Sequence, residues 1–156
     1  MARRLSAQDR FFAKVDKTGD CWQWTAKKTQ NGYGQFWLEG GHQVAHRVSF
    51  GWSVGAVPPG MQLDHVCHDR SCVRPSHLRV VNHKQNQENQ SGAYKNSRTG
   101  LRGVRRGRRG KGWRAEVTHH GTVHNWGPFA TPEEAAEAAR LKRLELFTHN
   151  DIDRVA

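Results

Sequence analysis

The feature that most constrains the fold is a run of metal-binding residue types in the middle of the chain. Cys67, Cys72 and His77 are separated by four residues each (C-x4-C-x4-H), and thiolates and imidazoles are the ligands of structural zinc. Cys21 is the one remaining cysteine and would complete a Cys3His site that connects the N-terminal strands to this segment. The residues alone leave a second interpretation open, in which these are buried thiols and a core histidine.

The surroundings of this motif also favour metal chemistry. Six histidines fall within 42 residues, namely His42, His46, His65, His68, His77 and His83. A length of 156 residues allows one ordinary domain or two small ones. Because only 35% of these residues are apolar, any core is modest. A small module of this kind often needs a metal for stability.

The charge balance indicates the class of partner. Lys and Arg outnumber Asp and Glu by 25 to 14, a formal net charge of +11, which favours a polyanion such as nucleic acid. The sequence has neither a run of about 18–20 apolar residues that would span a bilayer nor a signal-peptide pattern. We therefore expect no membrane partner and an intracellular location, in the cytoplasm of a bacterial or phage-infected host or in a eukaryotic nucleus.

The composition changes along the chain and predicts two modules of α+β class. Residues 95–114 contain nine basic and no acidic side chains and follow a polar stretch. We expect a first domain at residues 1–94, a linker at 95–100, a second domain at 101–149 and a tail at 150–156. In the first domain the patterns predict strands at 21–25, 33–38, 61–66 and 78–81, and helices at 44–52 and 83–89.

The second domain is expected to be a small three-stranded antiparallel sheet with one helix. Strand-like segments occupy residues 103–106, 113–118 and 122–126. Thr131 precedes a proline and two glutamates, which is typical of a helix N-terminus, and the helix should run to about Phe147. Its alanines at 135, 136, 138 and 139 would let it lie close against a sheet.

Motifs spread over residues 10–90 resemble the HNH and His-Cys box homing endonucleases, which share the ββα-metal nuclease fold. The matching segments are 19–24 (GDCWQW), 32–34 (GYG), 45–47 (AHR), 59–60 (PG), 64–67 (DHVC), Cys72, 75–78 (PSHL) and Asn86. The resemblance implies a zinc-stabilised ββα-metal module. It also implies a structural Zn²⁺ at Cys21, Cys67, Cys72 and His77.

The same resemblance assigns roles in catalysis. It implies His65 as general base, with Asn86 and Asp64 as ligands of a catalytic Mg²⁺ or another divalent cation. Arg47 is a candidate to hold the scissile phosphate through its planar fork; the alternative is a surface ion pair with an acidic residue. Arg74 replaces the asparagine usual before the proline, and we expect this change to remove a hydrogen bond that fixes the loop.

These residue types suit phosphodiester hydrolysis on chemical grounds. A histidine is largely neutral at cellular pH and can accept the proton of an attacking water. Magnesium prefers oxygen ligands, such as the Asp64 carboxylate and the Asn86 amide. It can bind a phosphate oxygen and the leaving oxygen together.

Segments of residues 97–148 resemble the DNA-binding domain of the plant ethylene-response (APETALA-type) factors. They are 102–106 (RGVRR), 111–117 (KGWRAEV), 127–129 (GPF) and 131–136 (TPEEAA). The resemblance implies a three-stranded sheet in the major groove of DNA, with Arg102, Arg105, Arg108, Trp113, Arg114 and Glu116 as DNA-binding residues. The alternatives are that the arginines only hold phosphates and that Trp113 belongs to the core.

Together these patterns predict a site-specific, metal-dependent endonuclease that acts on double-stranded DNA. The alternatives are a non-catalytic zinc-stabilised DNA-binding regulator and a nuclease directed by nucleic-acid structure or by RNA. The sequence leaves open whether the protein is a monomer that nicks one strand or a homodimer that cuts both.

Overall fold

The computed structural model describes residues 5–154, which form a mixed α/β structure with small antiparallel sheets. This confirms the predicted α+β class. The chain divides into two compact units, one up to His83 and one from Lys84 onward. The division falls before the linker expected at residues 95–100, because helix α3 (His83–Glu88) and the segment after it pack with the second unit.

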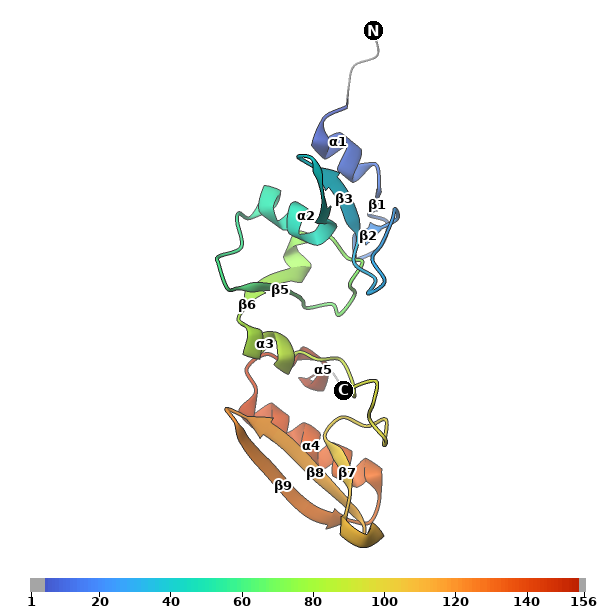
Figure 1. Cartoon of the computed structure of the whole chain (residues 1–156), viewed down its shortest axis with the longest axis vertical. Coiled ribbons are helices and arrows are strands. Elements are labelled where there is room, and N and C mark those ends of the chain that lie inside the picture. Colours follow the sequence, from blue (N-terminus) through green and yellow to red (C-terminus); the bar gives the residue numbers. More distant parts are fainter. Residues whose placement is uncertain (1–4, 155–156) are drawn as a thin grey trace. The chain divides into compact units, whose positions relative to one another are not determined.

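Among its described residues, 5–83, the first unit contains three two-stranded sheets and two α-helices, whose arrangement can be followed in Figure 1. Its elements are α1 (Ala7–Phe12), β1 (Val15–Asp16), β2 (Gln23–Trp24), β3 (Gln35–Leu38), β4 (Gly41–Val44), α2 (Ala45–Ser53), β5 (Gln62–His65), η1 (Pro75–His77) and β6 (Leu78–Val81). The strands expected at 33–38, 61–66 and 78–81 and the helix expected at 44–52 are present with small changes of boundary. The strand expected at 21–25 is shorter, and β4 was not expected.

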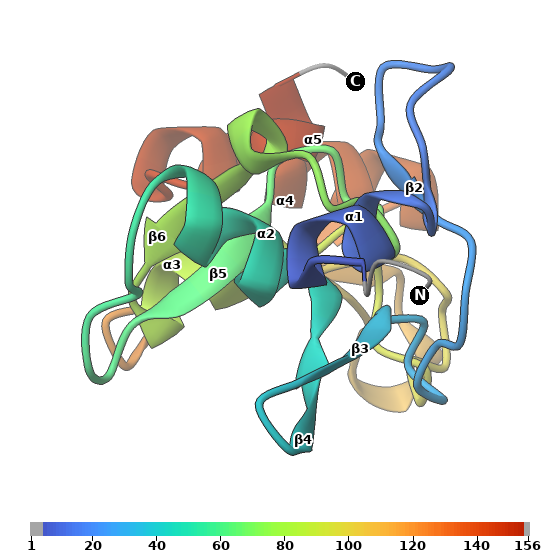
Figure 2. The same ribbon diagram turned by 90° about the horizontal axis from the view of Figure 1, so that it is seen from above.

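The β3–β4 hairpin leads directly into α2 (Figure 2). Its two-residue turn has positive φ angles at Glu39 (52°) and Gly40 (82°), as a tight hairpin turn of this length requires. At the other end of the hairpin, the Ala45 amide donates to the Gly34 carbonyl at 2.8 Å. The start of α2 is therefore fixed to the start of β3.

An aromatic cluster forms the main core of the first unit. Phe11, Trp24 and Phe36 are at most 2% exposed, and their ring centroids lie 5.0–6.0 Å apart. Phe11 comes from α1, a helix that the sequence analysis did not predict. Its signal is a capping box, in which the Ser6 hydroxyl accepts from the Asp9 amide at 3.1 Å.

Strands β5 and β6 form the hairpin that carries two of the predicted catalytic residues, Asp64 and His65. Asp64 lies opposite Arg79, and His65 lies opposite Leu78. Leu78 packs with Leu63 and with Phe50 of α2 in a second small core. The loop between the two strands contains Cys67 and Cys72 and ends in the short helix η1.

The second unit contains a three-stranded antiparallel sheet, in the order β7-β8-β9, packed against α4. Its elements after α3 are β7 (Val104–Arg106), η2 (Arg108–Gly110), β8 (Trp113–His119), β9 (Thr122–Phe129), α4 (Pro132–Leu146) and α5 (Asp151–Arg154). The predicted N-cap is confirmed, because the Thr131 hydroxyl accepts from the Glu134 amide at 3.1 Å. Ala115 and Val117 of β8 are buried against Ala139 of α4.

The segment expected to be a tail is part of this unit up to Arg154, while residues 155–156 lie outside the described residues. Asp153 of α5 is buried and accepts from Arg143 of α4 at 2.6 and 2.9 Å. Asn150 is fully buried and donates to the same carboxylate at 3.1 Å. This buried ion pair attaches the end of the described chain to α4.

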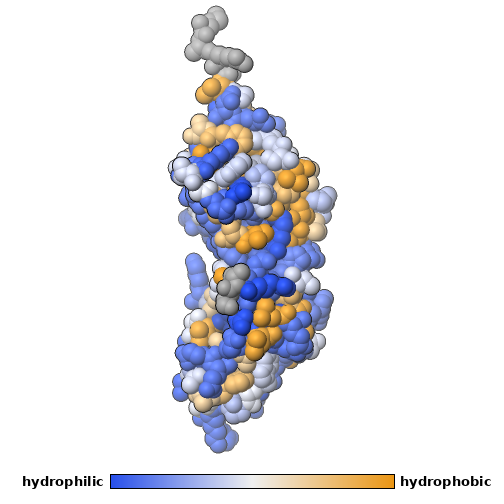
Figure 3. All heavy atoms as spheres, turned by 180° about the vertical axis from the view of Figure 1, so that it is seen from behind, coloured by the Kyte–Doolittle hydropathy of each residue, from blue (hydrophilic) through white to orange (hydrophobic). Residues whose placement is uncertain are grey.

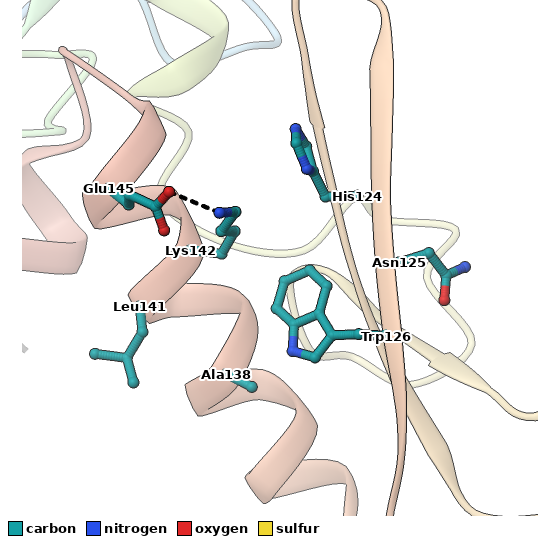
Figure 4. A pocket seen from close by; sticks show the side chains of 7 residues that line it. All are labelled: His124, Asn125, Trp126, Ala138, Leu141, Lys142 and Glu145. Atoms are coloured by element: carbon teal, nitrogen blue, oxygen red, sulfur yellow. Dashed lines mark hydrogen bonds and ion pairs between the residues drawn. The ribbon is translucent and has the colours of Figure 1, made fainter.

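The surface is largely polar. Hydrophilic side chains cover most of the face drawn in Figure 3, with small hydrophobic groups between them. In the second unit, Trp126 of β9 and Leu141 of α4 line an open hollow of about 540 Å³, beside the 2.7 Å ion pair of Lys142 and Glu145 (Figure 4). Among residues 5–154, no helix has the length and apolar character that a membrane crossing requires.

Candidate active site and zinc cluster

Four side chains in the first unit converge as the C-x4-C-x4-H motif and Cys21 predict. The ligand atoms of Cys21, Cys67, Cys72 and His77 all lie within 4.8 Å of one another. His77 Nδ1 is 3.5 Å from Cys21 Sγ and 3.7 Å from Cys72 Sγ. A tetrahedral zinc ion with Zn–S of about 2.3 Å and Zn–N of about 2.0–2.1 Å separates its ligand atoms by roughly 3.5–3.8 Å. The donor set and the two distances to His77 Nδ1 therefore fit a structural zinc site.

Asp20 and Arg74 form contacts that orient the imidazole of this cluster. His77 Nε2 faces Asp20 Oδ2 at 3.3 Å, and the Arg74 guanidinium donates to Asp20 Oδ1 at 2.5 Å and to its carbonyl at 2.6 Å. A carboxylate behind a metal-binding histidine is a common arrangement that fixes the ring and its tautomer. The loss of the loop-fixing hydrogen bond that an asparagine would make stays a prediction, and Arg74 itself donates two hydrogen bonds to Asp20.

The electrostatics of the cluster also fit a cation. Burial, and then the neighbouring thiols of Cys67 and Cys72, raise the pKa of Cys21 to about 12. Burial likewise raises the pKa of Cys67. Three thiolates so close together repel one another, and a divalent cation removes this cost because it binds the thiolate form.

Cys72 connects the cluster to the rest of the first unit. It forms an isolated antiparallel bridge with Gln23 of β2, supported by backbone hydrogen bonds from Trp24 to Ser71 (3.0 Å) and from Val73 to Trp22 (2.8 Å). The Cys72 carbonyl accepts a hydrogen bond from His65 at 3.0 Å. One residue thus supplies a thiol to the cluster and a carbonyl to the predicted base.

His65 has the geometry of a general base. It is 7% exposed, and its Nε2 must carry the hydrogen, because the Cys72 carbonyl can only accept. Burial lowers the pKa of His65, and this effect exceeds the opposing effects of the hydrogen bond to Cys72 and the charge of Asp64. The uncharged ring therefore keeps its lone pair on Nδ1 and can accept a proton there.

The carboxylate beside the base is held by a cross-strand ion pair. Asp64 is 7% exposed, and its Oδ2 accepts from Arg79 Nε at 3.0 Å and from Nη2 at 2.9 Å. Because the two residues are direct partners in the β5–β6 register, the pair fixes the side chain of Asp64 next to His65. The role of Asp64 as a metal ligand stays a prediction.

The two other predicted catalytic residues lie on helices. Arg47 is exposed in the first turn of α2, and no acidic partner for it is found among the described residues. The alternative that Arg47 forms a surface ion pair is therefore not supported. Asn86 is half-buried on α3, which continues into the second unit, and its role as a metal ligand also stays a prediction.

In the second unit, one face of the sheet carries three of the predicted DNA-binding residues. Ala115 and Val117 point to α4, so Arg114 and Glu116 of the same strand lie on the opposite face. Arg105 pairs with Glu116 at 2.7 Å, and Arg114 donates to Asn125 of β9 at 2.6 Å. We call Arg105, Arg114, Glu116 and Asn125 the polar sheet face.

The remaining predicted DNA-binding residues have different surroundings. Arg108 is exposed in η2, and Trp113 is half-buried with the Arg106 guanidinium 4.9 Å from its ring centroid. Arg102 points inward and donates to the carbonyls of Gln90 (2.7 Å) and Glu88 (2.9 Å). Its side chain thus stabilises the start of the second unit, and we leave it out of the proposed DNA contacts.

The structure also places residues near these sites that the sequence analysis did not select. Asp20 lies behind His77, and Asn125 belongs to the polar sheet face. The rings of His46 and Tyr33 lie 4.7 and 6.1 Å from the ring of His65. His46 and Tyr33 occur in the GYG and AHR segments, so they had a sequence signal, but only the packing shows what they contact.

Part of the chain is similar to known proteins. Residues 41–88 match the family model described as HNH endonuclease, a segment that includes Asp64, His65 and three of the four cluster residues. Two curated relatives come from Escherichia phage T7. Protein 7.7 is 33% identical over 69 residues (44% of this chain and 53% of that protein), and Protein 2.8 is 33% identical over 75 residues (47% and 50%).

These matches cover the chain only in part. The chain spans about half the length of the curated relatives that it matches. No solved structure matches the chain significantly. Residues 41–88 are therefore similar to HNH endonucleases, and the comparisons give no support for the APETALA-type resemblance of the second unit.

Proposed function

We propose that this protein is a metal-dependent DNA endonuclease in which His65 is the general base. The observation that carries the proposal is the hydrogen bond from His65 Nε2 to the Cys72 carbonyl, within a segment that matches HNH endonucleases. This bond places the hydrogen on Nε2, so that Nδ1 is the nitrogen that carries the lone pair of the neutral ring.

In the proposed reaction, His65 Nδ1 takes a proton from a water molecule, whose oxygen attacks the phosphorus atom of a phosphodiester. The bond from phosphorus to the 3′ oxygen breaks, its electron pair stays on that oxygen, and a proton from solvent completes the 3′ hydroxyl. The lowered pKa of His65 keeps the ring neutral and able to act at cellular pH. Arg47, exposed and without an acidic partner among the described residues, binds a phosphate oxygen.

The cofactors follow from the donor atoms. We propose that Zn²⁺ binds Cys21, Cys67, Cys72 and His77 and fixes the carbonyl that orients His65. Asp64 and Asn86 offer the oxygen atoms that Mg²⁺ prefers, and such a cation, when bound, stabilises the charge that develops on the phosphate and the leaving oxygen.

We propose that the second unit binds double-stranded DNA through its polar sheet face. Arginine and asparagine are the side chains that most often read guanine and adenine in the major groove. On this face Glu116 and Asn125 hold Arg105 and Arg114 in place, which lowers the entropy lost when the arginines bind. Arg108 adds a further exposed positive charge, suited to phosphate.

Cleavage of a supercoiled plasmid with Mg²⁺ tests the catalytic proposal. We expect the wild-type protein to cut the plasmid and EDTA to abolish cutting. His65→Ala should lose at least about 100-fold in activity, since general base catalysis contributes roughly 10²–10⁴-fold. His42→Ala is a matched control, because His42 is an exposed histidine in the same 41–88 segment. Equal cutting by wild-type protein and His65→Ala would refute His65 as the base.

The products of the same assay separate the remaining alternatives. Open-circle DNA indicates nicking by a monomer, and linear DNA indicates two coordinated cuts, as a homodimer makes. Specific DNA binding without cutting in any divalent metal would favour a non-catalytic regulator. Cutting of branched DNA or RNA in preference to a duplex would favour a structure- or RNA-directed nuclease.

A binding assay tests the polar sheet face. Arg114→Ala should weaken DNA binding about 10-fold and flatten its dependence on sequence, because a bidentate base contact is worth about 1–3 kcal/mol. Arg154→Ala removes an exposed arginine from α5 of the same unit and serves as the control. An equal effect of both substitutions would show that only the net charge matters.

A further inference from the structure

His46 is buried beside the proposed base and has no assigned role. It is 7% exposed and occupies the second position of α2. Its ring centroid lies 4.7 Å from that of His65, with an interplanar angle of 70°, and 5.4 Å from that of Tyr33. Tyr33 in turn lies 6.1 Å from His65. Two rings therefore pack against the imidazole of His65.

The nitrogen Nδ1 of His46 is buried and has no hydrogen-bond partner among the described residues. An unpaired buried polar atom costs stability, so an apolar side chain would be the more stable choice for packing alone. Burial, then the charges of His65 and Arg47, lower the pKa of His46 to about 3. The ring is therefore neutral and does not repel the proton that His65 accepts.

The backbone holds this ring in a fixed place. Ala45 is fully buried, and its amide donates a hydrogen bond to the Gly34 carbonyl at 2.8 Å. A Cβ atom at Gly34 would lie 3.0 Å from the Ala45 side chain, so the hairpin and the helix already touch. His46 follows directly, and its position relative to β5 is set by this contact and by the packing of Phe50 on Leu63.

We propose that His46 is a positioning residue, whose edge-to-face contact keeps the His65 ring in the plane that joins Nε2 to the Cys72 carbonyl and turns Nδ1 to the substrate. Edge-to-face pairs of aromatic rings favour one mutual orientation. A single hydrogen bond at Nε2 still allows the imidazole to rotate about the direction of that bond. The contact with the His46 ring removes this freedom. This role rests on the proposed function, because it concerns the same general base, His65.

Three substitutions separate ring contact from simple volume. His46→Phe keeps a flat ring, His46→Leu keeps much of the volume without a ring, and His46→Ala removes both. In plasmid cleavage with Mg²⁺ we expect kcat to fall at least 10-fold for His46→Leu and His46→Ala, with KM unchanged. The kcat of His46→Phe should stay within about 3-fold of the wild-type value. His42→Ala is the control, since His42 contacts Trp37 on the surface.

A second readout does not depend on cleavage. In NMR spectra of isotope-labelled full-length protein, the His65 Nε2 proton should be visible and slowly exchanging in the wild type and in His46→Phe. It should exchange faster in His46→Leu and His46→Ala. Loss of this signal in His65→Ala assigns it, and the thermal midpoint of each variant shows that it remains folded.

The outcomes distinguish this inference from the proposed function. Wild-type activity and a slowly exchanging proton in all His46 variants would refute the positioning role while the nuclease remains. Absence of cutting by the wild type, together with the expected exchange pattern, would refute the nuclease and keep the ring contact. Equal losses in the Phe, Leu and Ala variants, with lowered thermal midpoints, would show that His46 acts only in folding.

Discussion

A substitution at Gly34 tests how tightly the first unit is packed beneath its candidate site. A Cβ atom at Gly34 would lie 2.6 and 2.7 Å from Cγ and Cδ1 of Trp24, and 3.0 Å from the Cβ of Ala45. Trp24 is 1% exposed and contacts the rings of Phe11 and Phe36. The indole therefore has no space into which it can withdraw.

The expected cost of Gly34→Ala follows from these distances. Carbon atoms in contact lie about 3.5–4.0 Å apart, so the methyl group and the indole must separate by nearly 1 Å. Overpacking of a filled core costs about 1–3 kcal/mol. At roughly 2 kcal/mol the thermal midpoint of a unit of this size falls by about 8–16 °C.

Gly51→Ala is the matched control, because it makes the same chemical change on α2 where nothing lies within 4 Å of the new Cβ atom. A glycine in a helix interior is about 1 kcal/mol less favourable than alanine, so this variant should be more stable than wild type. The assay is thermal unfolding followed by near-ultraviolet circular dichroism, to which Trp22, Trp24, Trp37 and Trp52 of the first unit contribute. Midpoint shifts of the same sign in both variants would refute the packing argument.

Three further predictions concern the zinc cluster and the second unit. Chelation of zinc, or Cys72→Ser, should abolish the unfolding transition of the first unit, because metal binding and folding are coupled in small sites; a chelated protein with an unchanged transition would contradict this. Asp20→Asn should weaken zinc binding by about 10–100-fold, measured by competition with a chromogenic chelator, whereas an unchanged affinity would show that Asp20 does not support His77 as a zinc ligand. Burial alone would raise the pKa of Asp153, but hydrogen bonding and the charge of Arg143 outweigh it, and the folded pKa is lowered. Asp153 therefore stabilises the protein above pH 3.8, the ordinary pKa of the group, and loses this effect as the pH falls through its folded pKa. Asp153→Asn should cost about 3–5 kcal/mol at neutral pH, and in urea unfolding this difference should shrink below pH 3.8; a constant difference down to pH 2 would oppose the ion-pair argument.

Local sequence patterns were sufficient for several elements. Thr131 with Glu134 marks the start of α4 because the capping bonds lie within four residues of sequence. The strands β5 and β6 and the Cys3His cluster could also be predicted, since the types and spacing of Cys67, Cys72 and His77 restrict the chemistry. Short strands such as β2 depend on pairing with the distant Cys72 segment, so their limits could not be read from the sequence.

In the candidate site, too, the sequence predicted the residue types, whereas the contacts between them depend on the fold. The sequence selected His65 and Asp64 by residue type, but their partners come from elsewhere. The Cys72 carbonyl sets the tautomer of His65, Arg79 holds Asp64, and His46 packs on the base. The sequence also grouped Arg102 with the other arginines, although burial directs its guanidinium to backbone carbonyls.

What the amino-acid sequence determined by itself is the chemistry available to the protein: a thiol and imidazole donor set, a histidine beside a carboxylate, and a strongly basic charge. These depend on residue type and on short spacings, which the chain fixes before it folds. Only the tertiary structure decided which atoms face one another. The ring of His46 and the carboxylate of Asp20 reach their partners through packing between separate segments of the chain, and the Cys72 carbonyl reaches His65 only because the loop between them folds back.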